Sequence, residues 1–361
     1  MRVAVDEQIF AIQPYGGISR LFAELARQYA SSVIPDLELL PQDAPIINRY
    51  VLDDQLVRDA LKAREARNEW TALARYFSRI SVKTNCDVVH NTFYLPHGLA
   101  PTRGAKRIVT VHDMIPELMP QTRRRLDLLT MKRRYVESAD HVICVSEATR
   151  DDLRKVFGHI NAPVTVVHHG VDPRFRPDVP KIDGLPEKYV LFVGNRGQYK
   201  DADVLFAAFA ELKKFDDLML VCAGGGQFTK DEIQRFRQLG ISNRVLHLEL
   251  NDDAMASAFS NAELFVFPSR FEGFGLPAIE AMACGTPTIL AAATSLPEVG
   301  RDAVVYFEPG NVRELAGVMS DVLESNHVRN ELSEKGKQRA QQFTWKRTAQ
   351  QTADVYRTAL G

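Results

Sequence analysis

The chain has 361 residues, 45% of them hydrophobic, and a formal net charge of -1 at pH 7. Since this length is about twice that of a usual domain, we expect two domains with ordinary buried cores. The near-zero charge excludes a general attraction to nucleic acid, and no apolar run reaches the roughly 18 residues of a membrane span. Asp6 and Glu7 interrupt the apolar start, so no signal peptide is expected. The scattered cysteines lack metal-ligand spacing and favour buried thiols in a cytoplasmic protein.

In the first half of the chain, short β-branched runs alternate with amphipathic stretches. This alternation predicts a parallel sheet in an α/β domain. Ser146 is expected to cap a helix, because its hydroxyl can accept from the amides of the following turn. The loop before the first long helix contains Gly16 and Gly17. Strands are predicted at 2–5, 37–40, 87–90, 107–112, 141–145 and 164–167, and helices at 18–30 and 53–80.

Residues 173–186 contain four prolines and little apolar periodicity, which predicts a linker between domains. A second series of strands and helices then begins, and a last helix is expected at 345–360. The architecture predicted is two doubly wound α/β domains that face each other across a cleft. The strands predicted in the second domain are 189–193, 218–222, 245–248, 264–267, 288–292 and 304–307.

The segment after the predicted strand 264–267 carries the most chemical information. It contains a loop with two glycines and then a helix that opens near Pro277, since proline suits a first helical turn. Glu272 lies on the loop and Glu280 lies one turn into the helix. Such a loop and helix start at a strand's carboxyl end favour an anion. The two carboxylates are interpreted as a general acid/base pair or as acceptors for hydroxyl groups, against ordinary surface glutamates.

Cations and glycines follow other predicted strands. Arg196 and Lys200 lie after strand 189–193, where they could neutralise a diphosphate, or they are solvated surface cations. Gly16 and Gly17 permit close approach to a phosphate, or form a plain turn. The glycines at 224–226 fit either a close approach to a nucleotide or a flexible turn.

Histidines and a basic stretch complete the candidates in the first half. His112 and Asp113 end a strand, which favours contact with a substrate over a purely local pair, and His90 and Asn91 are placed similarly. The basic residues at 123–134 predict either contact with an anionic lipid-linked acceptor or membrane surface, or a solvated helix face.

Together these motifs resemble the group 1 glycosyltransferases. Glu272 and Glu280 match the family's E-x7-E spacing, and the other motifs fall in the family's order over nearly the whole chain. The segments 15–20 and 193–196 are similar to bacterial surface-polysaccharide members, many of them mannosyltransferases. The resemblance implies the two-domain B-type fold, with residues 1–172 plus 345–361 binding the acceptor and residues 173–344 binding a nucleotide sugar. The resemblance also implies that the last helix of the chain returns to the N-terminal domain.

The resemblance also implies roles for matching positions. Arg196 and Lys200 would hold the donor diphosphate, and Glu272 and His112 would contact the sugar. These four form the expected catalytic set. The other expected donor-binding positions, which face the phosphates, the sugar, the ribose or the base, are Gly16, Gly17, Asn195, Leu250, Gly273, Phe274, Gly275, Leu276 and Glu280.

The implied function is retaining transfer of a hexose, mannose from GDP-mannose, to a glycan or lipid-linked hydroxyl in surface-polysaccharide synthesis. No cofactor or metal is expected, because cations and amides would stabilise the leaving diphosphate. The expected location is the cytoplasm, at the inner face of the membrane if the basic stretch binds lipid. The alternatives are a sugar-nucleotide epimerase or a phosphorylase on the same architecture, and an inactive nucleotide-sugar-binding homologue.

Overall fold

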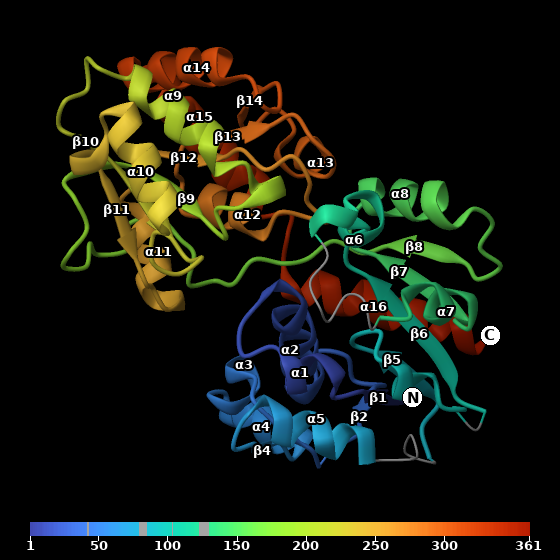
Figure 1. Cartoon of the computed structure of the whole chain (residues 1–361). Helices are drawn as coiled ribbons and strands as arrows, with labels where there is room; N and C mark the ends of the chain where they lie inside the picture. Colours follow the sequence, from blue (N-terminus) through green and yellow to red (C-terminus); the bar gives the residue numbers. More distant parts are fainter. Residues whose placement is uncertain (42, 79–84, 103, 123–129) are drawn as a thin grey trace. The chain divides into compact units, whose positions relative to one another are not determined.

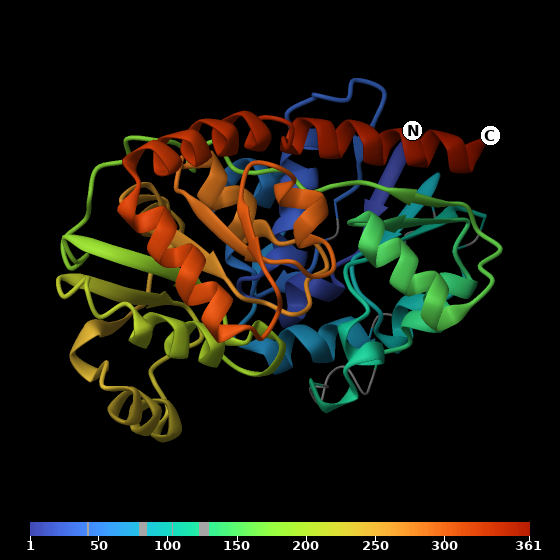
Figure 2. The same cartoon turned by 90° about the horizontal axis from the view of Figure 1, so that it is seen from above.

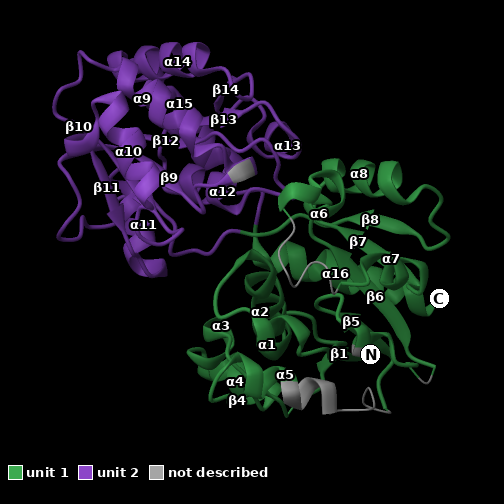
Figure 3. Ribbon diagram, in the orientation of Figure 1, with its two compact units in different colours: residues 1–170, 344–361 green, residues 171–343 purple. Residues whose placement is uncertain are grey.

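The structure is a computed structural model that describes residues 1–41, 43–78, 85–102, 104–122 and 130–361 (Figure 1). Contacts divide the chain into two compact units (Figure 3). Unit 1 comprises Met1–Gly170 and Thr344–Gly361, and unit 2 comprises Val171–Phe343. The divisions lie close to the expected ones, after residues 172 and 344.

Within the described residues, unit 1 contains a six-stranded parallel sheet in the order β2-β1-β5-β6-β7-β8. Its inner strands are buried on both faces, as their β-branched runs predict. The chain runs outward from β1 to β2 and then returns to β5 on the other side of β1, so the topological switch point lies between β1 and β5. The strands are β1 (Arg2–Val5), β2 (Glu38–Leu39), β5 (Val88–Asn91), β6 (Lys106–Val111), β7 (His141–Cys144) and β8 (Val164–Val166).

The helices of unit 1 differ from expectation in two places. The single helix predicted at 53–80 is wrong: the chain leaves α4 through Lys62, whose φ of 48° is left-handed, and the short strand β4 intervenes before α5. Residues 79–80 lie outside the described part. The other difference is α1, a short helix that was not expected. The elements are α1 (Gln8–Ile12), α2 (Gly17–Ala30), β3 (Pro45–Ile46), α3 (Arg49–Leu52), α4 (Gln55–Leu61), β4 (Arg64–Glu65), α5 (Glu69–Ser78), α6 (Ile115–Leu118), α7 (Lys132–Glu137) and α8 (Glu147–Phe157).

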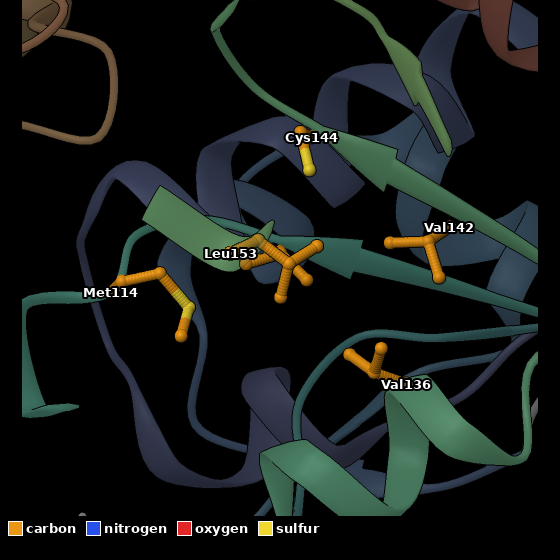
Figure 4. Close-up of a cluster of buried hydrophobic side chains, with 6 residues drawn as sticks. Met114, Val136, Val142, Cys144 and Leu153 are labelled. Atoms are coloured by element: carbon orange, nitrogen blue, oxygen red, sulfur yellow. The ribbon is translucent and has the colours of Figure 1, made fainter. Parts of the chain in front are cut away.

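The start of α8 and one buried cluster follow directly from the sequence. The predicted cap is confirmed, because the Ser146 hydroxyl accepts from the Thr149 amide at 3.0 Å. Apolar side chains from β6, β7, α7 and α8 surround Cys144 (Figure 4). Burial raises the pKa of the Cys144 thiol to about 12, so it behaves as a packing group. Cys86 is half-buried and the other three cysteines are buried, all with free thiols.

The last helix, α16 (Trp345–Leu360), packs in unit 1 against α2, β6 and β7 (Figure 2). The Tyr356 hydroxyl lies 2.7 Å from Nδ1 of His90 on β5. Arg357 forms an ion pair of 2.7 Å with Asp36. The predicted return of this helix to the N-terminal half is therefore confirmed, and it covers one face of the sheet that the first half of the chain builds.

Unit 2 also contains, within the described residues, a six-stranded parallel sheet, in the order β11-β10-β9-β12-β13-β14. Here the switch point lies between β9 and β12, because the chain builds outward on one side of β9 and then returns to its other side. The predicted α/β class with two doubly wound domains is confirmed. The strands are β9 (Lys188–Val193), β10 (Leu218–Ala223), β11 (Val245–Leu248), β12 (Leu264–Phe267), β13 (Thr288–Ala291) and β14 (Val305–Phe307).

The helices of unit 2 form two packed groups, as a doubly wound sheet requires: α9 contacts α10 and α14, and α12 contacts α11, α13 and α15. The helices are α9 (Ala202–Glu211), α10 (Lys230–Leu239), α11 (Asp252–Ser260), α12 (Leu276–Ala283), α13 (Leu296–Gly300), α14 (Val312–Glu324) and α15 (Asn326–Ala340).

The predicted linker at 173–186 needs correction. It contains no helix or strand, but it belongs to unit 2 and is held there by α11. The amides of Val179 and Ile182 donate to the hydroxyls of Ser260 and Ser257, each at 3.1 Å. Prolines removed the apolar periodicity on which the prediction relied, while serine hydroxyls supplied the missing partners.

Candidate functional site

The predicted catalytic lysine and glutamate meet at the switch point of unit 2. Lys200 follows β9 and Glu272 follows β12, and Nζ of Lys200 donates to Oε1 of Glu272 at 2.6 Å. Only 15% and 10% of the two side chains are exposed, so the pair is poorly screened by water. The Arg270 amide donates to the Tyr199 carbonyl at 2.7 Å and joins the two loops. Two residues that lie 72 positions apart in the sequence thus form one ion pair.

The loop after β12 is held by two residues that the sequence reading missed. The Glu272 amide donates to Oγ1 of Thr294 at 2.9 Å. The Ser295 hydroxyl lies 3.0 Å from the carbonyl oxygens of Glu272 and Phe274 and donates to them. Thr294 has φ 46°, which places its side chain toward the loop at a cost in backbone strain. A left-handed non-glycine residue beside a glycine loop is visible only in the structure.

The start of α12 provides the second part of this site. Gly275, with φ 102°, is the N-cap and supplies no side-chain cap, and Pro277 lies in the first turn as predicted. The first amides of α12 therefore suit an anion. Gly273, Phe274 and Gly275 are buried, Leu276 is half-buried, and Glu280 is buried with 6% exposed.

Arg196 is bound to the protein itself. Its Nε donates to Oε1 of Glu232 at 2.7 Å, and Nη1 donates to the Gly224 carbonyl at 2.7 Å. Nη2 donates to the carbonyls of Gly226 and Gln227 at 2.8 and 3.0 Å. The guanidinium is thus not the free surface cation that the alternative reading described, and its contact with a diphosphate stays a prediction.

Two further donor-binding candidates lie at the same edge of the sheet. Asn195 follows β9 and is exposed, and Leu250 follows β11 and is half-buried. Asn251 caps α11 by accepting from the Ala254 amide at 2.9 Å. Because β9 and β11 are parallel, these loops share the carboxyl edge with Lys200 and Glu272.

His112 is a buried polar side chain of unit 1. It follows β6, is 6% exposed and packs against Phe22. Neither ring nitrogen has a hydrogen-bond partner among the described residues. Burial, together with the charges of His169, His90 and Lys132, lowers the pKa of His112 well below 6.5, so the ring is neutral. A buried imidazole without partners costs free energy and is typical of a ligand contact.

At the glycine pair that begins α2, the protein itself already supplies a hydrogen-bond acceptor to the first turn of the helix. Oε1 of Gln13 accepts from the Ser19 amide at 3.1 Å, and a Cβ at Gly16 would meet the Gln13 side chain at 2.4 Å. Gly16 is therefore required for the close approach of Gln13, and Gly17 begins the helix. This contact explains Gly16 as a packing requirement, and the phosphate role of Gly16 and Gly17 stays a prediction.

Two other expectations in unit 1 are wrong. His90 is fully bonded, to Tyr356 and to the Thr110 hydroxyl at 2.8 Å, and serves the fold. Of the described part of the basic stretch, Lys132 is buried and donates to Glu117 at 2.8 Å, against expectation, whereas Arg133 and Arg134 are exposed as expected. The other part of that stretch, residues 123–129, lies outside the described residues.

The switch point of unit 1 is filled by its own polar groups. Asp6 accepts from the Thr92 amide at 2.9 Å and from the Asn91 side chain at 2.6 Å. Oε1 of Gln8, on α1, accepts from the Leu95 amide at 2.7 Å. The unexpected helix α1 thus closes the switch point of unit 1, the position that corresponds to the one where Lys200 and Glu272 lie in unit 2.

The described residues contain neither a cluster of metal ligands nor a helix that could span a membrane. No group of three or more metal-ligating side chains in the described ranges is arranged to hold a metal ion. In the same part of the chain, every helix is too short or too polar to cross a lipid bilayer.

The sequence matches two family models that divide the chain between them. Residues 177–339 match glycosyl transferases group 1, and residues 15–175 match glycosyltransferase family 4. The chain is 27% identical to the MMP alpha-(1->4)-mannosyltransferase of Mycolicibacterium hassiacum, over 98% of this chain and 90% of that protein. It is 26% identical to O-antigen chain mannosyltransferase B of Escherichia coli, over 73% of this chain and 72% of that protein. Its fold is similar to that of Anabaena HepE, solved in complex with UDP-glucose, with a TM-score of 0.74 at 18% identity over 99% of both chains.

Proposed function

Because the chain belongs to the group 1 glycosyltransferases, we propose that it moves mannose from GDP-mannose to a hydroxyl of a glycan or lipid-linked acceptor. The observation that carries this proposal is the Lys200–Glu272 pair beside the uncapped start of α12. A cation and the amides of a helix start would bind a diphosphate, and a carboxylate next to them would accept hydrogen bonds from sugar hydroxyls.

The donor is proposed to bind mainly to unit 2. Lys200 would divide its three N–H groups between Glu272 and the diphosphate, so that the sugar and the leaving group are held by one connected pair. The amides of Gly273 to Leu276 would contact the sugar. Glu280 would accept from the ribose hydroxyls, because its side chain leans toward the start of α12.

The reaction is proposed to proceed with retention. The bond between the anomeric carbon and the diphosphate oxygen breaks, and the electron pair leaves with the diphosphate. Lys200 and the amides at the start of α12 stabilise the charge that develops there. The acceptor oxygen attacks from the same face, and its proton goes to a diphosphate oxygen. Glu272 then orients the sugar and does not act as a nucleophile.

His112, in unit 1, is proposed to contact a sugar hydroxyl. As a neutral imidazole it can donate one hydrogen bond and accept another, which suits a hydroxyl group. Its two unpaired ring nitrogens support this role.

Donor choice is tested by thermal shift with GDP-mannose, UDP-glucose, GMP and mannose 1-phosphate. A ligand at 100 times its Kd stabilises a folded protein by about 2.7 kcal/mol. We expect GDP-mannose to raise Tm more than UDP-glucose does. The names of two relatives support mannose, whereas HepE was solved with UDP-glucose. Stabilisation by UDP-sugars alone would reject GDP-mannose, and stabilisation by none of the nucleotides would reject a nucleotide-sugar enzyme.

Stereochemistry and metal dependence are tested on the product. We expect NMR coupling constants to give the donor's anomeric configuration, and turnover to persist in EDTA. An inverted product would reject the retaining mechanism. Loss of turnover in EDTA, restored by a divalent cation, would reject the metal-independent one.

A further inference from the structure

We infer that Glu232 and the glycine loop 224–226 are positioning elements for Arg196, holding its guanidinium at the carboxyl edge of the unit 2 sheet. This inference rests on the proposed function and on the predicted contact of Arg196 with the donor diphosphate. It assigns a role to a carboxylate and a glycine run that no motif explained.

Glu232 performs two tasks at once. Its Oε1 accepts from Nε of Arg196 at 2.7 Å, and its Oε2 accepts from the Thr229 amide at 2.7 Å. The second bond belongs to a capping box that begins α10. The carboxylate is therefore fixed by the helix start, and it fixes Arg196 in turn. Burial raises the pKa of Glu232, but hydrogen bonds from Arg196 and Thr229 outweigh it and lower this pKa below 4.5, so the carboxylate is charged at neutral pH.

The glycine loop supplies the other acceptors. Gly224, Gly225 and Gly226 have φ values of 82°, 74° and 73°, a run of left-handed residues that only glycine adopts without strain. This path turns the carbonyls of Gly224 and Gly226 onto Nη1 and Nη2 of Arg196. A Cβ at Gly225 would lie 3.0 Å from Nη1 of Arg196 and 3.0 Å from the Gly194 carbonyl. The loop is thus shaped to the guanidinium.

Arg196 is held with little freedom. Phe228 lies under the guanidinium, with Cζ 4.9 Å from the ring centroid, and only 4% of the Arg196 side chain is exposed. The contacts at or below 3.0 Å use four of its five N–H groups, one on Nε, one on Nη1 and two on Nη2. The remaining Nη1–H is the one group that can be offered to a ligand without breaking these bonds. A donor contact prepared in this way loses little side-chain entropy on binding.

The test measures how much the β-phosphate contributes to binding. Isothermal titration gives the affinity ratio of GDP to GMP for the whole chain and its variants, with UDP and UMP as the second probe pair. Arg196→Ala should reduce this ratio about tenfold, the effect of losing one hydrogen bond to a charged group. Glu232→Gln and Gly225→Ala should each reduce it by between about threefold and tenfold, because they disturb the arginine without removing it.

Matched variants separate positioning from general damage. Arg235→Ala removes another arginine near this helix, one that lies on α10 and pairs with Asp203 instead of Glu232. Gly240→Ala places a side chain at a φ of 70°, similar to that of Gly225, in open space at the other end of α10. We expect both to keep the wild-type ratio, and thermal unfolding confirms that each variant is folded.

The outcomes are distinguishable. If Arg196→Ala lowers the ratio but Glu232→Gln and Gly225→Ala do not, the positioning inference is wrong and the proposed function stands. If Arg196→Ala leaves the ratio unchanged, the diphosphate role of Arg196 is wrong, and the inference falls with it. If the Arg235 and Gly240 variants lower the ratio as much as the others, the effect is general damage and the inference is rejected.

Discussion

The two units are both built on doubly wound parallel sheets, although their strand orders differ, and they use their switch points in opposite ways. In unit 1 the space between β1 and β5 is closed by α1 and by hydrogen bonds to Asp6. In unit 2 the space between β9 and β12 carries the Lys200–Glu272 pair and a helix start without a side-chain cap. A doubly wound sheet thus creates a ligand position that the sequence either fills with its own side chains or leaves for a substrate.

The ionisable side chains of the two units also differ. Unit 2 concentrates the ion pairs of Arg196 and Lys200, which suit an anionic donor. Unit 1 buries His90, His112 and His169, and burial keeps each of them neutral. Neutral groups are suited to hydroxyls, so the comparison supports a division of labour between donor and acceptor that the following variants can break.

The largest expected effect is selective destabilisation of unit 1 by acid. Burial lowers the pKa of His90 and His169 to about 3, and that of His112 well below 6.5. Since the unfolded chain binds these protons near pH 6.5 and the folded chain does not, stability is full above pH 6.5 and falls below it. At pH 5 the loss is about 2 kcal/mol for each of His90 and His169, or roughly 4 kcal/mol for the two, and His112 adds to it in the same direction.

Tryptophan fluorescence can follow this loss. Both tryptophans, Trp70 and Trp345, belong to unit 1, so their emission reports that unit, while circular dichroism reports both. Between pH 7.5 and 5 we expect the fluorescence midpoint in urea to fall more than the remaining dichroism transition. Equal movement of the two transitions would contradict the difference between the units.

The next largest effect is on turnover. Lys200→Ala should lower kcat by about 10²–10³, or about 2.7–4 kcal/mol, because the departing diphosphate loses a charge contact. It should also weaken GDP binding, as measured by titration. Lys188→Ala is the control, since Lys188 is 52% exposed and pairs with Asp217 at the surface. Turnover within threefold of wild type in Lys200→Ala would remove the lysine from the mechanism.

The smallest expected effect, on turnover by a variant in unit 1, should distinguish the roles of the two units most clearly. His112→Ala should lower kcat about tenfold, or about 1.4 kcal/mol, because one hydrogen bond to the sugar is lost. GDP affinity should not change, since the nucleotide is proposed to bind unit 2. His141→Ala, which removes a buried histidine bonded to Thr165, should leave kcat unchanged. A fall in GDP affinity in His112→Ala would argue against the proposed division of labour.

Much of the fold could be predicted from the sequence, because buried parallel strands are continuous apolar runs. The expected strand at 264–267 coincides with β12, and the last helix coincides with α16. Local signals failed where a few residues decide the path. The left-handed Lys62 ended a predicted helix, and α1 has only five residues and no side-chain cap. The family resemblance was confirmed by both family models.

The sequence predicted which residues belong to the candidate site, but it did not predict which of them bond to each other. Strand ends indicated Lys200, Glu272 and His112, because parallel strands place their carboxyl ends on one edge. The 2.6 Å bond between Lys200 and Glu272 depends on β12 lying beside β9, a strand order that no local pattern encodes. In the same way, the Thr229–Glu232 spacing predicts a helix start, but nothing near it in sequence indicates Arg196 as the second partner.

The position of α16 affects the order in which the chain folds during synthesis. Unit 2 is one uninterrupted segment, so all of its strands can leave the ribosome before α16 is made. The sheet of unit 1 is translated first, yet its His90 must wait for Tyr356 and its β6–β7 face must wait for the helix that covers it. The unit that emerges first is therefore completed last. A nascent chain ending at Phe343 would expose apolar strands of unit 1 while unit 2 is already whole, which makes that stage the one most in need of chaperone protection.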